Sequence, residues 1–417
     1  MSGANSKQAE KDYLRRSGSL EWERVKPFAP PATDTLQESL RLMHDFAVAV
    51  NALDASAGHR ILDLGAGSCW TSEWLARLNL SVVSVDIAHD MLMVGQARLA
   101  SLAHARNGAD LVNADLESLP FPSESFDRAL CLNALHHVPD VGAALREVAR
   151  VLGPQGRLVL VEPGRGHAQR ETSKTAVSEF GVLEQDLEAS DLMRLCTEAG
   201  FARVTVWPLS YMAGEIELAQ DDLARWRKWA RTARPLRAVG KLWRALLEVP
   251  GVGKAGPLFE DSLSMWVSRV LLRHVGEQSV VVATKSGYVG DRPKYRAAIA
   301  VDSSAADASD RFRYKLRLRN AGSVTWRARS RSGRVQIGIQ LLDGARTVLN
   351  RDYSRVSLPH DVAPGAECLV DIDPPLPQSA GPHYFRFDLV AEGIAWFDAN
   401  EPAPVIVPAS VSRRDRG

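Results

Sequence analysis

Short apolar runs alternate with amphipathic stretches over the first two thirds of the chain. Apolar runs rich in β-branched residues lie at 60–64, 80–85, 128–132, 156–163, 201–208 and 279–284. The earlier runs are followed by Gly, Asp or Asn, and apolar residues recur at helical spacing between them, as in 141–152. This pattern is typical of buried parallel strands that lead into loops at their carboxyl ends. With one more strand before Asp115, it predicts an α/β fold on a seven-stranded sheet.

The pattern of apolar positions changes beyond about residue 290, where apolar and polar residues alternate. The alternating apolar positions include Tyr314, Leu316, Leu318, Val335, Ile337, Ile339, Phe385, Phe387 and Leu389. Turn sequences at 343–344, 363–365 and 380–382 separate these runs. Short alternating strands spaced by turns predict an all-β sandwich.

These two patterns divide the chain. A length of 417 residues favours two or three domains. We expect a polar, proline-containing flexible arm at 1–32 with a short helix around Lys11 to Arg16, an α/β domain at 33–287 and a β-sandwich at 294–410. The α/β domain carries a helical insert at 210–278, between its last two strands.

Composition and charge argue against several classes of protein. The formal net charge of +1 gives no overall attraction to nucleic acid. The four cysteines lie far apart, which fits a reducing compartment and predicts no metal site. The amino terminus lacks an apolar signal core and no apolar run is long enough to span a bilayer, so we expect a cytoplasmic protein. The oligomeric state is left open.

Candidate chemistry concentrates where the first strands end. Gly65 and Gly67 follow the first run and allow a sharp turn close to a ligand. Asp86 follows the second run, about 20 residues after the glycines, where a carboxylate typically binds ribose hydroxyls. Asp115 could accept a hydrogen bond from the exocyclic amine of a base. Together these positions predict a nucleoside ligand with an anionic tail.

The glycine loop also excludes two ligand classes. A dinucleotide fold would place a small residue where Trp70 stands, and a P-loop would continue with Gly-Lys-Ser or Gly-Lys-Thr. Instead, Asp63-x-Gly65-x-Gly67, Asp86, Asp115 and the stretch 126–138 resemble, in order, four motifs of the class I S-adenosylmethionine-dependent methyltransferases.

The resemblance implies a Rossmann-like methyltransferase domain with S-adenosylmethionine as its cofactor. The cofactor-binding residues that it implies are Asp63, Gly65, Ala66, Gly67, Asp86, Ile87, Met91, Asp115, Leu116 and Asn133.

Three histidines are candidates for the catalytic base. His136 and His137 follow the fourth strand, and His167 follows the fifth. A positioned histidine can remove the proton of an acceptor hydroxyl. Each can equally be a structural loop histidine.

The insert and the sandwich give indications of the molecule that accepts the methyl group. Residues 225–244 of the insert hold eight Arg or Lys residues and three tryptophans without an acid. This stretch could be core with a solvated basic face, a peripheral contact with the inner membrane surface, or a protein contact. The stretch around Asn320 to Trp326, with Ala395 to Phe397, resembles immunoglobulin-like sandwiches of bacterial polysaccharide-assembly enzymes. Trp326 and Trp396 could stack on a sugar or belong to the core.

Three functions are consistent with these features. The first is O-methylation of a saccharide or lipid-linked glycan precursor in cell-surface polysaccharide biosynthesis, with the sandwich adding a second contact to the acceptor. The second is methylation of a small aromatic or quinone-like metabolite. The third is a scaffold without catalysis that binds through the sandwich. Cofactor binding separates the third from the others.

Overall fold

A computed structural model describes residues 3–28, 36–56, 58–100, 109–209, 278–288, 295–306, 312–329, 333–378, 381–397 and 405–409. The predicted insert at 210–278, with its basic stretch 225–244, therefore lies outside the described residues apart from its last residue. In the part of the chain that is described, no helix is long and apolar enough to cross a membrane.

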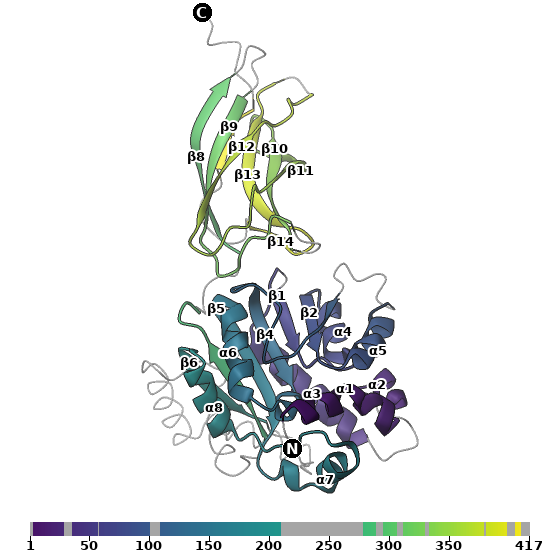
Figure 1. The fold of residues 1–417 in the computed structure, drawn as a ribbon. Coiled ribbons are helices and arrows are strands. Elements are labelled where there is room, and N and C mark those ends of the chain that lie inside the picture. The colour runs from purple at the N-terminus through teal and green to yellow at the C-terminus, as the bar shows by residue number, and fades with distance from the viewer. Residues whose placement is uncertain are drawn as a thin grey trace, which may run out of the picture.

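The first domain is built on the predicted seven-stranded sheet, with the order β3-β2-β1-β4-β5-β7-β6 (Figure 1). Its strands are β1 (Arg60–Leu64), β2 (Ser81–Asp86), β3 (Ala109–Asn113), β4 (Phe126–Leu132), β5 (Leu152–Pro163), β6 (Arg203–Pro208) and β7 (Gln278–Thr284). Strands β1 to β5 run parallel to one another, and β7 pairs antiparallel with both β5 and β6. The α/β prediction is confirmed.

The helices of this domain cover both faces of the sheet and the end at which the parallel strands finish (Figure 1). They are α1 (Gly3–Ser17), α2 (Leu20–Val25), α3 (Leu36–Leu53), α4 (Trp70–Arg77), α5 (His89–Ala100), α6 (Val141–Val151), α7 (Glu171–Thr175) and α8 (Ala189–Glu198), with the single turns η1 (Leu135–His137), η2 (His167–Gln169) and η3 (Ala176–Phe180). Successive strand residues point to opposite faces, so Ile61 packs in the cluster that contains α3, whereas Leu62 packs in the cluster that contains α6 and α8. Burial on both faces explains why these strands are almost wholly apolar.

The prediction of a flexible arm at 1–32 is wrong for the described part of that stretch, although the short helix expected around Lys11 to Arg16 lies within α1. Residues 3–17 and 20–25 form α1 and α2, and Ala9 and Leu14 are buried. Arg16 donates hydrogen bonds to the carbonyls of Phe180 and Glu179, at 2.6 and 2.7 Å. The helix α1 thus lacks a wide apolar face, and long-range polar contacts add to the burial of Ala9 and Leu14 in holding it in place.

The second domain consists of two antiparallel sheets. One has the order β12-β9-β8, and the other has the order β11-β10-β13-β14, with β15 also pairing with β13. The strands are β8 (Ala297–Ala306), β9 (Phe312–Asn320), β10 (Val335–Leu342), β11 (Val348–Ser357), β12 (Glu367–Ile372), β13 (Tyr384–Ala391), β14 (Ala395–Trp396) and β15 (Val405–Pro408). Every alternating apolar position named from the sequence is buried between the sheets. The likeness to immunoglobulin-like domains stays a prediction.

The two candidate sugar-stacking tryptophans have different surroundings. Trp326 is fully buried in the core of the sandwich, so the core alternative is confirmed for it and stacking on a sugar is excluded. Trp396 is half-buried and packs over Gly338, where an added Cβ would lie 2.2 Å from the indole. The guanidinium groups of Arg351 and Arg355 lie over its ring, at 5.5 and 4.8 Å from the centroid.

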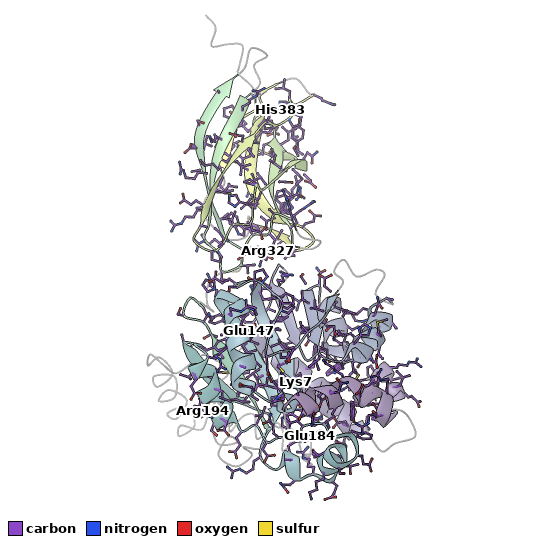
Figure 2. All side chains as sticks on the ribbon, viewed as in Figure 1. Lys7, Glu147, Glu184, Arg194, Arg327 and His383 are labelled. Atoms are coloured by element: carbon purple, nitrogen blue, oxygen red, sulfur yellow. The ribbon has the colours of Figure 1, made fainter. Side chains whose placement is uncertain are left out.

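The sandwich contacts the edge of the sheet where the parallel strands begin. Arg327 forms an ion pair of 2.7 Å with Asp127 at the start of β4, and the Asp127 carboxylate also accepts from the backbone N–H of Arg60. Figure 1 shows the sandwich at one end of the sheet and α1 and α7 at the other, and Figure 2 labels Arg327 at the junction. The sandwich is therefore remote from the carboxyl ends of the strands.

This arrangement predicts that the α/β domain keeps its ligand affinity without the sandwich. A chain that ends after Tyr288 retains the hydrogen bond from the Tyr288 hydroxyl to Asp54, at 2.7 Å. It loses the contacts of the sandwich with the edge of the sheet where the parallel strands begin, such as the ion pair of Arg327 with Asp127. We expect a soluble protein whose cofactor affinity, measured by calorimetry, lies within about twofold of that of the full chain. Aggregation, or loss of affinity that Arg327→Ala in the full chain reproduces, would show that the sandwich belongs to the ligand-binding unit.

Candidate active site

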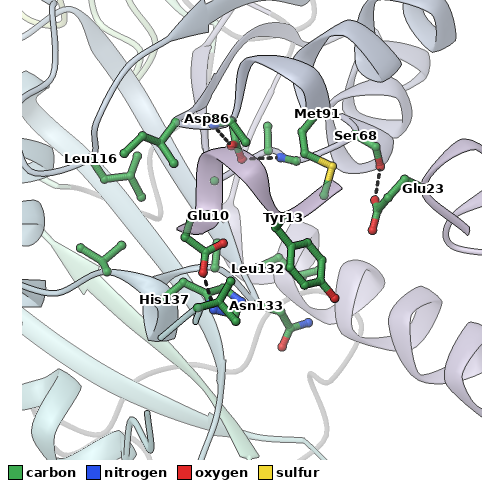
Figure 3. Close-up of a pocket in the computed structure, with 18 of the residues that line it drawn as sticks. Glu10, Tyr13, Glu23, Ser68, Asp86, Met91, Leu116, Leu132, Asn133 and His137 are labelled. Atoms are coloured by element: carbon green, nitrogen blue, oxygen red, sulfur yellow. Dashed lines mark hydrogen bonds and ion pairs between the residues drawn. The ribbon is translucent and has the colours of Figure 1, made fainter. Parts of the chain in front are cut away.

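A cavity of about 340 Å³ opens at the carboxyl ends of β1, β2 and β4. All the cofactor-binding residues predicted from the sequence line it: Asp63, Gly65, Ala66, Gly67, Asp86, Ile87, Met91, Asp115, Leu116 and Asn133. Figure 3 shows several of these side chains around the space beneath α1. Lys7, Glu10 and Tyr13 of α1 and Glu23 of α2 close the other side.

The glycine loop between β1 and α4 needs both glycines for a steric reason. Gly65 and Gly67 have φ of +64° and +52°, a region that favours glycine. A Cβ on Gly65 would lie 2.3 Å from the Cβ of Ala134, whereas a Cβ on Gly67 would meet no atom within 4 Å. Gly65 therefore allows close packing inside the fold, and Gly67 leaves the backbone open to the cavity.

Asp63 stabilises the glycine loop through hydrogen bonds with the start of α4. Its buried carboxylate accepts hydrogen bonds from the hydroxyls of Thr71 and Ser72 at the start of α4, at 2.6 and 2.5 Å. Burial raises the pKa of Asp63 to about 6, although these hydroxyls oppose the shift. The carboxylate thus joins the end of β1 to α4.

The two other predicted acids, Asp86 and Asp115, already have partners within the protein. Asp86 accepts from the backbone N–H groups of Gly67 and Ala88, at 2.7 and 2.8 Å, and burial raises its pKa. Because a carboxylate can accept about four hydrogen bonds, Asp86 retains capacity for ligand hydroxyls. Asp115 forms an ion pair of 2.7 Å with Lys7, a contact that the sequence did not indicate.

Asn133 provides a test of whether the cavity fits S-adenosylmethionine. It adopts φ of +55° and lines the cavity, and its Nδ2 is buried with no hydrogen-bond partner among the described residues. An unpartnered donor near the glycine loop suits the carboxylate of such a ligand, and Asp86 suits its ribose hydroxyls. Ile87, Met91 and Leu116 add apolar lining. The donor set and the lining therefore fit this cofactor.

The three candidate catalytic histidines come together beside this cavity. The rings of His136 and His137 have centroids 3.9 Å apart, and those of His136 and His167 are 4.8 Å apart. Glu184, which the sequence analysis did not single out, lies 2.5 Å from Nε2 of His167 and 3.9 Å from Nε2 of His136. His137 and Glu184 line the cavity itself.

His136 is paired with a buried carboxylate. Glu162, at the end of β5, lies 2.7 Å from Nδ1 of His136. Burial lowers the pKa of His136 to about 4. Burial alone would raise the pKa of Glu162, but hydrogen bonds from His136 and backbone amides outweigh it and lower the pKa. This pair is therefore a neutral imidazole and a carboxylate at neutral pH.

His137 faces α1. Its Nδ1 lies 3.4 Å from Oε1 of Glu10, the contact drawn in Figure 3. Burial raises the pKa of Glu10 to about 7, against the opposing effect of His137. Burial would lower the pKa of His137, but Glu10 and Glu184 outweigh it and raise the pKa. Glu10 lies 127 residues from His137 in the sequence, so no local signal could have paired them.

Comparison with known proteins identifies the domain type. Residues 62–160 match a family model described as a methyltransferase domain. The chain is 30% identical over 185 residues to an uncharacterized methyltransferase of Bacillus subtilis, YcgJ, an alignment that covers 44% of this chain and 66% of the relative. It is 38% identical to the methyltransferase GfsG of Streptomyces halstedii, over 26% of this chain and 40% of the relative.

A third relative has a substrate in its name. The chain is 36% identical to a demethylmenaquinone methyltransferase of Paenarthrobacter aurescens, over 28% of this chain and 43% of the relative. The chain thus spans about half the length of the curated relatives that it matches. These similarities support an S-adenosylmethionine-dependent methyltransferase domain, with S-adenosylmethionine as its cofactor.

Proposed function

We propose that the whole protein is an S-adenosylmethionine-dependent methyltransferase that methylates a hydroxyl group of a polar acceptor, with a saccharide or lipid-linked glycan precursor as the acceptor class. The observation that carries the proposal is one cavity that is lined by two groups of residues. Figure 3 shows Asp86 at one end of this cavity and His137 at the other. The backbone N–H of Gly67 donates to Asp86 at 2.7 Å, and carboxylate oxygens of Glu10 and Glu184 lie 3.4 and 3.9 Å from His137.

One group of residues would bind the cofactor, and the other would bind the acceptor. Bound S-adenosylmethionine supplies an activated methyl group. Asp86 and the glycine loop hold the nucleoside side of this ligand, and Asn133 donates toward its anionic tail. An acceptor hydroxyl must lose its proton, and the histidine and carboxylate groups at the other end are placed to bind that hydroxyl and to receive the proton. Positioned general bases contribute about 10²–10⁴-fold in rate, and alignment of reactants contributes more.

The polar character of the acceptor end supports a saccharide. Glu10, Tyr13, His137 and Glu184 offer several hydrogen-bonding groups in one place, which suits a ligand with many hydroxyls. The sandwich domain also supports a saccharide acceptor, but only because it resembles domains of polysaccharide-assembly enzymes. It does not line the cavity in the described part of the chain, so the expected second contact near the reacting group is not part of the proposal.

A quinone-like aromatic acceptor is the second candidate. The similarity to a demethylmenaquinone methyltransferase favours it, and Leu42, Val138 and Val182 give the cavity some apolar lining. A scaffold without catalysis is a weaker candidate, because the residues around the cavity fit the cofactor.

A labelling experiment tests the acceptor class. Purified protein is incubated with S-adenosylmethionine carrying a radiolabelled methyl group and either a cell-envelope glycolipid extract or a panel of phenols and quinols. We expect label in the glycolipid fraction, and we expect Glu10→Gln to reduce it at least about 10-fold by removing a proton acceptor. Label confined to the aromatic panel would favour the second candidate, and cofactor binding without transfer to either would favour the scaffold.

A further inference from the structure

We propose that His136, His137 and Glu184 form a binding site for a divalent first-row transition-metal ion at the acceptor end of the cavity. One ligand atom from each of these residues lies within 4.8 Å of the other two. The site itself is independent of the proposed function, and only its use to bind an acceptor hydroxyl rests on that function. No metal site was predicted from the sequence, in which the cysteines lie far apart and Glu184 lies 47 residues beyond His137.

The hydrogen bonds of the two histidines prepare them as ligands. Nδ1 of His136 lies 2.7 Å from the Glu162 carboxylate, and Nδ1 of His137 lies 2.7 Å from the carbonyl oxygen of Leu183. A carbonyl and a carboxylate only accept, so each Nδ1 carries the hydrogen, and each ring would bind an ion through the lone pair that Nε2 has when the ring is neutral. Metal-binding histidines commonly donate their other N–H to a carboxylate or a backbone carbonyl in this way.

The carboxylate of Glu184 is held by a hydrogen bond with His167. Its Oε2 lies 2.5 Å from Nε2 of His167 and 3.9 Å from Nε2 of His136. Nδ1 of His167 is buried without a hydrogen-bond partner among the described residues. The hydrogen bond from His167 therefore positions the carboxylate of Glu184 beside the rings of His136 and His137.

The donor set indicates the class of ion. Two imidazoles and one carboxylate suit Zn²⁺, Mn²⁺, Fe²⁺ or Co²⁺, whereas Mg²⁺ and Ca²⁺ prefer oxygen ligands alone. Ligands about 2.1 Å from a shared ion lie roughly 3.4 Å apart, so the side chains would close in by about 1 Å on binding. Three protein ligands leave an open coordination position. Because His137 and Glu184 line the cavity, an ion held between them would lie beside it.

Metal binding is measured directly on the full chain, without reference to activity. Protein treated with a chelator is titrated with Co²⁺, followed by its visible absorption, and then with Zn²⁺ by calorimetry. We expect one ion per chain, and Zn²⁺ should displace Co²⁺. His137→Gln should weaken binding at least about 100-fold because a ligand is lost. His167→Gln keeps all three ligands and should weaken it about 10-fold through loss of positioning.

His360→Gln is the matched control, since His360 is an exposed histidine of the sandwich. It should bind as the unchanged chain does. Thermal unfolding checks each variant, and His167→Gln keeps the proposal testable if His137→Gln fails to fold. Absence of Co²⁺ and Zn²⁺ binding, or equal binding by the unchanged chain and by folded His137→Gln and His167→Gln proteins, overturns the site. Stoichiometric metal binding without transfer to either acceptor panel supports the site and counts only against the proposed function.

Discussion

Replacing Asp86 by alanine should weaken the binding of S-adenosylmethionine at least about 100-fold, measured by calorimetry. Two losses combine at this position. The variant lacks the carboxylate that is expected to accept from the ribose hydroxyls. It also lacks the acceptor for the backbone N–H groups of Gly67 and Ala88, at 2.7 and 2.8 Å, which hold the glycine loop against the end of β2.

Asp86→Asn separates these two contributions. Asparagine keeps one carbonyl oxygen and can still hold one backbone N–H group, but it loses the charge, so we expect an affinity between those of the alanine variant and the unchanged chain. Asp110→Ala is the matched control, because Asp110 is an exposed aspartate of β3 outside the cavity. An unchanged affinity in Asp86→Ala would contradict the assignment of this cavity to the cofactor.

Replacing Glu162 by alanine should lower the free energy of unfolding of the α/β domain by about 3–5 kcal/mol. The side chain is buried at the end of β5, and its Oε1 accepts from the backbone N–H groups of Ala134 and Leu135 at 3.1 and 2.9 Å. Its Oε2 lies 2.7 Å from Nδ1 of His136. Alanine leaves these donors buried without an acceptor, and each such group costs about 1–3 kcal/mol.

Urea-induced unfolding measures this effect. Glu162→Gln keeps one acceptor oxygen in a side chain of the same size and should cost less than the alanine variant. Glu171→Ala changes a glutamate whose side chain is 88% exposed and should shift the free energy of unfolding by no more than about 0.5 kcal/mol. A cost below about 1 kcal/mol for Glu162→Ala would mean that the loop after β4 is held by other contacts.

The fold of the α/β domain was predictable because its signals are local. Strand and helix periods are properties of neighbouring residues, and the buried runs at Arg60–Leu64 and Ser81–Asp86 are apolar for reasons that a short window reveals. The glycine loop was predictable for the same reason, since a positive φ restricts the residue type at Gly65 and Gly67 themselves. The alternation of the sandwich strands is equally local.

Apart from a short helix around Lys11 to Arg16, the amino-terminal helices were not predictable in the same way. Residues 3–17 look polar because their anchoring partners are distant in the sequence: Lys7 pairs with Asp115 at 2.7 Å, and Arg16 reaches the carbonyl of Phe180. A window of neighbouring residues contains one member of each pair, so the stretch resembled a solvated arm. The structure instead makes α1 one wall of the cavity.

The sequence by itself determined the two domain types, the positions of the strands and the acids and glycines at their carboxyl ends, because each depends on residues close together in the chain. Only the tertiary structure decided which distant groups meet. It brought Glu10, His137 and Glu184 to one cavity and His136 to Glu162, and it set Arg327 against Asp127 at the opposite edge of the sheet. These contacts depend on how helices and loops pack across the sheet, and hydrogen bonds between residues far apart in the chain leave no periodic trace in the sequence.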